Sequence, residues 1–159
     1  MGLIIKNEIQ KLMVGYPTVS DKYDVGAGML EGTVNAKNGD VLKYGSVSGA
    51  YEVASNITSA DQVAGVLLAT NVKTPNTYPA AIGSVETLVG ESFNLCVRGF
   101  IAVELDSAAV LADAKEGSPV YITSAGKLTT VAANNVKLPW KFMGITETHG
   151  TAKIAEIVL

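Results

Sequence analysis

The chain has 159 residues, which is enough for one domain or two small lobes with a buried core. Hydrophobic residues make up 48% and charged residues 17%, and this balance excludes a chain that its composition keeps disordered. The net charge is -3 and Arg98 is the only arginine, so we do not expect nucleic-acid binding, which relies on arginine-rich basic surfaces.

Residues 1–35 differ in composition from the rest of the chain and are predicted to form an N-terminal arm. Ile5, Ile9 and Leu12 have helical spacing, but a helix this short is unstable in water without a partner. Two interpretations are open: an arm that becomes ordered on binding, and a short helix packed on the chain's own core. Polar residues follow Ile5 directly, so the apolar run is too short for a signal peptide. No later apolar run is long enough for a membrane span.

Residues 36–159 are predicted to form a β-rich domain, because β-branched and small residues alternate with turn residues. The expected strands cover residues 40–44, 50–54, 63–69, 93–105, 120–123, 127–131, 141–146 and 152–159. Gly99 is expected to be a bulge or bend in the long strand.

Two connections between these strands are informative. Asp106 followed by an alanine-rich run to Ala112 predicts one short helix with an acidic cap. The long connection 71–91 contains Pro75, Pro79, Gly83 and Gly90, and its length indicates a contact surface.

Two parts of the chain share an order of features, which predicts two related lobes at about 38–105 and 115–159. Gly39, Gly49 and Gly65 precede or interrupt strands in the first part, and Gly117, Gly126 and Gly144 do so in the second. One such unit cannot bury its apolar face alone, whereas two packed together can. The alternative is chance similarity in a sequence rich in Gly, Ala and Val.

Catalytic and metal-binding residues are sparse. His149 is the only histidine and Cys96 the only cysteine, so zinc binding, a Ser/His site and an internal disulfide all lack their usual parts. No catalytic residue, metal or cofactor is predicted. A lone cysteine is typical of a reducing compartment or of a particle assembled in one, and Cys96 is expected to be a buried strand residue.

Three larger side chains have two interpretations each. Trp140 and Phe142 share one face of a strand, as a core anchor or as an interface contact, and the core is favoured because the chain has few other large residues. Arg98 ends an apolar strand, where it either forms a buried or interface ion pair or lies at the surface.

The glycine and β-branched spacings resemble those of bacteriophage head decoration, or cement, proteins. The first part, with 39–43, 63–68 and 94–99, is similar to the lambda-type head decoration protein, and the second, with 115–122, 126–128, 143–145 and 154–158, to small phage cement proteins of related design. The resemblance covers residues 38–159, and residues 1–35 contain no matching motif.

The resemblance implies a compact β-tulip-like barrel or sandwich with an extended arm. It also implies a homotrimer that binds the major capsid protein at local threefold positions on the outer surface of a mature capsid, and stabilises the shell. The protein would be made in the cytoplasm of the bacterial host. By position and composition, the capsid-binding residues would be Ile4, Ile5, Ile9, Leu12, Met13, Tyr16 and Pro17.

Two other functions remain open at this point. The first is another virion component, such as a tail or head fibre protein, which would share the β-rich composition. The second is a small β-fold enzyme or ligand-binding module, which the shortage of titratable and aromatic residues disfavours.

Overall fold

The computed structural model describes residues 12–18, 23–69 and 86–159. This part of the chain is mainly β, with two short 3-10 helices, η1 (Ala60–Gln62) and η2 (Leu111–Asp113). The strands are β1 (Tyr23–Leu30), β2 (Ala36–Lys37), β3 (Val41–Tyr44), β4 (Ala50–Val53), β5 (Val63–Leu67), β6 (Glu86–Thr87), β7 (Ser92–Leu105), β8 (Pro119–Ile122), β9 (Leu128–Thr129), β10 (Val136–His149) and β11 (Ala152–Val158).

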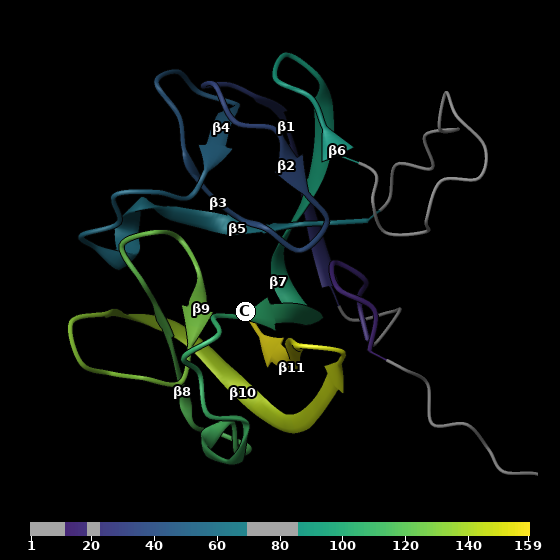
Figure 1. The fold of residues 1–159 in the computed structure, drawn as a ribbon. Helices are drawn as coiled ribbons and strands as arrows, with labels where there is room; N and C mark the ends of the chain where they lie inside the picture. Colours follow the sequence, from purple (N-terminus) through teal and green to yellow (C-terminus); the bar gives the residue numbers. More distant parts are fainter. Residues whose placement is uncertain (1–11, 19–22, 70–85) are drawn as a thin grey trace, which may run out of the picture.

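The strands form two closed rings that share β7. The first ring runs β1-β4-β3-β5-β7 and closes by pairing of β7 with β1. The second runs β7-β11-β10-β8-β9 and closes by pairing of β9 with β7. Figure 1 shows the first ring above the second. We call them the first and second barrel, and β2 and β6 form a separate two-stranded sheet beside the first.

Strand β7 passes from one barrel to the other at Gly99. Before this residue, β7 pairs with β1 and β5, and from Phe100 onward it pairs with β11. Gly99 has a φ of 124°, which favours glycine because that region is crowded for residues with a Cβ. The predicted bend at Gly99 is therefore confirmed, and it lets one strand serve two barrels.

The pairing pattern confirms the internal duplication. Each barrel has one parallel pairing, β1–β4 or β7–β9, and its other four pairings are antiparallel. The turn glycines are also equivalent: the Gly39 amide donates to Leu67 over 2.9 Å, and the Gly117 amide donates to Phe142 over 2.8 Å. Chance similarity in composition does not produce matching pairings and hydrogen bonds.

One detail of the predicted duplication is wrong. Because Leu67 corresponds to Phe142 in the hydrogen-bond pattern, the equivalent of Gly65 is Trp140, two residues earlier, and not Gly144. Gly144 instead lies where the register of β10 against β11 shifts, with a φ of 78°. An extra residue in a bulged strand changes the spacing of the residues around it, which disturbs sequence alignment by spacing.

The hydrophobic core extends through both barrels. One cluster contains Val41, Val66 and Cys96 from the first barrel with Phe142 and Trp140 from the second. A smaller cluster, which includes Leu30, Leu42, Leu67, Phe93 and Leu95, fills the far end of the first barrel. The buried positions of Cys96, Trp140 and Phe142 agree with the predicted core roles.

The two barrels meet closely at Gly126. This glycine has a φ of 81°, and a Cβ added to it would lie 1.9 Å from the carbonyl oxygen of Ala54. Nearby, the Ile57 amide donates to the Ser124 carbonyl oxygen over 3.3 Å, and the ammonium of Lys127 lies 3.8 Å from a carboxylate oxygen of Asp40. The two barrels are thus packed on each other and share one strand.

All eight predicted strands are present, with shifts at their ends, but the predicted helix is wrong. Asp106 does accept a hydrogen bond from the Ala108 amide, at 2.8 Å, yet only a 3-10 turn forms, at Leu111–Asp113. The reason is Val110, which is extended and donates its amide to the Thr130 hydroxyl over 2.9 Å, so the chain cannot continue an α-helix.

Strand β1 was not among the strands predicted from the sequence. Tyr23–Leu30 lies within the segment predicted as an arm, but it pairs along β7 and closes the first barrel. Its glycines are required by packing, since a Cβ on Gly28 would lie 2.2 Å from the Tyr51 ring. Without side chains at Gly26 and Gly28, this strand lacks the apolar alternation by which strands are recognised.

Candidate functional site

The N-terminal segment that the structure describes, residues 12–18, is fastened to the second barrel. The Gly15 amide donates to the Ala102 carbonyl oxygen over 2.9 Å, and the Thr18 amide donates to Phe100 over 3.1 Å. Pro17 forms an antiparallel bridge with Ile101. These contacts add the segment to the edge of β7 that faces away from β11, so we call residues 12–18 the strap.

Side-chain contacts hold both ends of the strap. Leu12 packs on Ala102 and Ile154, and its amide donates to the Glu147 carboxylate over 2.9 Å. At the other end, the Thr18 hydroxyl donates to the carboxylate of Glu156, which is buried. A buried carboxylate needs such a partner, because burial without one is costly. The strap is therefore part of the folded body.

The predicted site residues fall into three groups. Ile4, Ile5 and Ile9 lie outside the described residues. Leu12 is buried at 7% exposure, and Pro17 is partly buried in its bridge. Met13 and Tyr16 are exposed, at 48% and 38%. Among the predicted residues that the structure describes, Met13 and Tyr16 are thus the ones available for contact with another molecule.

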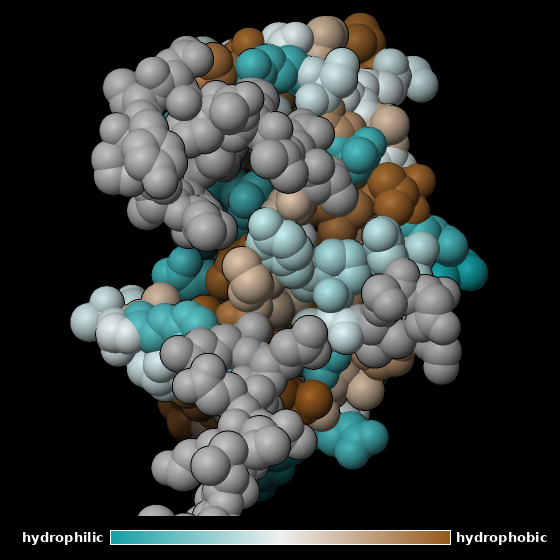
Figure 2. Space-filling view, turned by 90° about the vertical axis from the view of Figure 1, so that its right-hand side faces the viewer, coloured by the Kyte–Doolittle hydropathy of each residue, from teal (hydrophilic) through white to brown (hydrophobic). Residues whose placement is uncertain are grey.

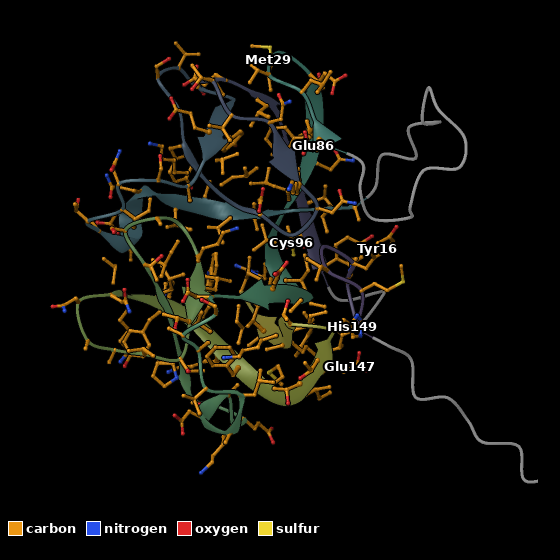
Figure 3. The ribbon with its side chains drawn as sticks, viewed as in Figure 1. Tyr16, Met29, Glu86, Cys96, Glu147 and His149 are labelled. Carbon is orange, nitrogen blue, oxygen red and sulfur yellow. The ribbon has the colours of Figure 1, made fainter. Side chains whose placement is uncertain are left out.

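Figure 3 shows Tyr16 on the side of the molecule that also carries Glu147 and His149. The His149 ring nitrogen Nε2 lies 2.9 Å from Glu147 Oε2, the atom that accepts from the Leu12 amide. His149 ends β10 at the turn before β11. Its carboxylate partner is committed to the strap, so the pair is part of the strap's attachment.

Exposed apolar side chains occur in several places on the described surface. Figure 2 shows brown patches separated by polar surface on the face that bears the strap. Four of them, Met29, Val47, Leu88 and Val89, lie at the end of β1 or in the two turns that hydrogen-bond to it. Figure 3 labels Met29 at this end of the first barrel. A second group, Val25 and Val97, lies along β1 and β7.

Several charged groups of the described residues have partners at the surface. Arg98 lies 3.7 Å from Asp24 with both side chains largely exposed, which makes this a surface ion pair. Glu31 accepts from the Ser46 amide and hydroxyl. Within residues 12–18, 23–69 and 86–159, no group of three or more His, Cys, Asp or Glu side chains is placed to hold a metal ion.

A cavity of about 240 Å³ lies between the barrels, next to the strap residue Val14. It is lined by charged groups of both signs, among them Lys37, Asp40, Glu104 and Lys127. Asp40 is already engaged with Lys127 and with the Lys37 amide, at 3.8 and 2.8 Å. The Asp40 carboxylate in this cavity is therefore already paired within the chain.

Cys96 is a free, buried thiol. Burial raises the pKa of its thiol from 9.0 to about 11, partly offset by a backbone hydrogen bond at Arg98. A thiol with so high a pKa is a poor nucleophile at neutral pH.

In the described part of the chain, no helix is long and apolar enough to cross a bilayer.

Comparison with known families decides among the functions that this geometry leaves open. Residues 7–159 match the model of a phage family described as structural cement protein (E217 gp24/Pam3 gp6). The chain belongs to this family of phage structural cement proteins. The prediction of a capsid cement protein is thereby confirmed, and this cement protein is a structural protein that stabilises the phage capsid.

A solved structure has the same fold. A chain of the structure titled "The capsid of Myoviridae Phage XM1" matches with a TM-score of 0.63 and 16% identity, over 98% of this cement protein and 95% of that chain. At this identity the match establishes the fold alone. No protein with a curated function matches the chain.

Proposed function

We propose that this cement protein binds the outer surface of the mature capsid as a homotrimer at local threefold positions. The observation that carries the proposal is the family match over residues 7–159, since it assigns a cementing role to both barrels together. The trimer and its position are carried over from the resemblance to lambda-type head decoration proteins. Synthesis in the host cytoplasm agrees with the single reduced cysteine.

Stabilisation in this proposal requires no chemistry. A protein that binds the expanded shell but not its precursor stabilises the expanded state by mass action. A trimer that touches three shell subunits at once gains effective concentration, so each contact can be weak. Closed symmetry limits the assembly and prevents runaway polymerisation.

The N-terminal region supplies the shell contact in this proposal. Met13 and Tyr16 are exposed on the strap, and Ile4, Ile5 and Ile9 precede it in the chain. The strap itself is hydrogen-bonded to β7. The major capsid protein is the partner, and the apolar residues before the strap are its proposed contact.

Co-sedimentation with capsids tests this proposal. Purified protein is mixed with expanded, undecorated shells of the cognate phage and, separately, with unexpanded procapsids. Saturable binding to expanded shells in multiples of three supports it, and absence of binding to the cognate shell overturns it. Binding to purified tails instead would establish another virion component.

A truncation separates the arm from the body. Deletion of residues 1–11 leaves the strap in place, so the barrels are expected to unfold at an unchanged denaturant midpoint while shell binding is lost. A Met13→Ser, Tyr16→Ser variant tests the exposed strap residues in the same assay. Full binding by both variants would exclude the N-terminal region as the shell contact.

A further inference from the structure

The strap occupies a defined seat on the second barrel. In the second half of β7, the Ala102 amide donates to Tyr16 over 3.3 Å, and the Ala102 carbonyl oxygen accepts from Gly15 over 2.9 Å. Ala102 is fully buried beneath the strap, with Leu12 packed on it. The strap and β9 thus pair with the same edge of β7. Strand β9 pairs with it at Leu105, and the strap covers the residues before that point.

The internal duplication places the same seat on the first barrel. Leu30 is a pairing residue of the parallel β1–β4 ladder, and Leu105 has the same place in the parallel β7–β9 ladder. Counting back from these leucines, Ala27 is the equivalent of Ala102. Ala27 is exposed whereas Ala102 is 0% exposed, and among the described residues no strand pairs with this edge of β1 below Met29.

The backbone amide and carbonyl of Ala27 point away from β7, toward the side of β1 on which β4 lies. The Met29 amide donates to Gly49 on the β4 side, at 3.0 Å, whereas the Leu30 amide donates to Glu91 on the β7 side, also at 3.0 Å. Because neighbouring residues of a strand alternate in direction, the amide and carbonyl of Ala27 face the β4 side, as those of Met29 do. Ala27 therefore presents a donor and an acceptor to an added strand.

Exposed apolar side chains flank this edge. Val25 and Met29 are 50% and 47% exposed on β1, and Val97 of β7 is 44% exposed beside Gly26. Three half-exposed side chains make a patch far smaller than the about 800 Å² that each partner buries in a stable two-protein complex. The edge is too small to hold a second copy by itself, but it suits one of many repeated contacts on a lattice.

We infer that the β1 edge at Val25–Met29 receives an extended segment of the capsid shell protein, which adds as a strand in the way that the strap adds to β7. This inference rests on the proposed function, because it names how the shell is bound. Strand addition gives affinity through main-chain hydrogen bonds, and the flanking apolar side chains give specificity. The exposed Asp24–Arg98 ion pair lies at the N-terminal end of this edge, directly before Val25.

Two substitutions block the edge in different ways. Ala27→Lys places a charge where native edge strands carry one to prevent strand addition. Ala27→Pro removes the outward amide while leaving the ladder residues Gly26 and Gly28 intact, and edge strands tolerate proline. The matched control is Val110→Lys, which makes the same charge change at an exposed valine of the second barrel, 49% exposed. Circular dichroism and thermal unfolding establish that each variant is folded.

We expect both Ala27 variants to bind expanded shells at least tenfold more weakly than the wild type, with Val110→Lys unchanged. If the wild type binds and the folded Ala27 variants bind equally well, the inference fails while the proposed function stands. If the wild type does not bind the cognate shell, the proposed function fails as well.

Amide hydrogen exchange gives a readout that needs no substitution. In the free protein, the Ala27 amide is expected to exchange much faster than those of Gly26 and Gly28. In the shell-bound protein, a peptide covering residues 24–29 is expected to gain protection. A slowly exchanging Ala27 amide in the free protein, or no added protection on the shell, overturns the inference.

Discussion

The contact between the barrels at Gly126 can be tested with an internal control. Gly126 and Gly49 are equivalent hairpin glycines, with φ of 81° and 82°. A Cβ at Gly49 meets nothing within 4 Å, whereas one at Gly126 would lie 1.9 Å from the Ala54 carbonyl oxygen. Substituting each by alanine imposes the same backbone strain, but only Gly126→Ala forces the barrels apart.

The magnitudes follow from these two contributions. A left-handed alanine costs about 1–2 kcal/mol, so Gly49→Ala is expected to lower the free energy of unfolding by that amount. Gly126→Ala adds the steric overlap, which costs about 1–3 kcal/mol when a packed region must shift. We expect the Gly126 variant to lose about 2–5 kcal/mol, a large part of the typical 5–15 kcal/mol of a domain.

Urea unfolding followed by Trp140 fluorescence and by circular dichroism measures both variants. The expected result is a midpoint that falls modestly for Gly49→Ala and by at least twice as much for Gly126→Ala. Equal losses in the two variants would refute the reasoning, because the seam would then tolerate the added methyl group. A large loss at Gly49 alone would show that backbone strain, and not packing between barrels, dominates.

Other predictions concern the buried thiol and the strap. Cys96 should react with iodoacetamide at pH 8 only on unfolding, and rapid labelling of the native protein would contradict its burial. Since its folded pKa of about 11 exceeds the unfolded 9.0, its contribution to stability is complete below pH 9 and is lost as pH rises toward 11; Cys96→Ala should reduce that alkaline decrease. Thr18→Val should lower the free energy of unfolding by about 1–3 kcal/mol, because Glu156 loses its hydroxyl donor, and an unchanged urea midpoint would show that the strap is not fastened there.

Much of the fold could be predicted from local sequence. The eight strands after residue 36 carry β-branched residues between turn glycines, and all eight are present. The role of Gly99 was also predictable, since a glycine within a long apolar strand indicates a bend. The cement family was recognised from the same spacings and confirmed over residues 7–159.

The candidate site was less predictable. The sequence indicated an apolar N-terminal segment, but the burial of Leu12 and the exposure of Met13 depend on where the strap meets β7 and β11. Strand β1 escaped prediction because Gly26 and Gly28 remove the apolar alternation, and the reason for these glycines is the Tyr51 ring and Leu95 packed against them. Such close contacts join residues far apart in sequence.

The sequence by itself thus determined the β-rich class, the duplicated units and the absence of a histidine or cysteine pair, because these depend on composition and local periodicity. Only the tertiary structure decided that the two units close as barrels sharing β7, and that a strap covers one β edge while the equivalent β1 edge stays exposed. Closure and edge pairing are long-range hydrogen-bonding choices, which no local pattern of side chains specifies.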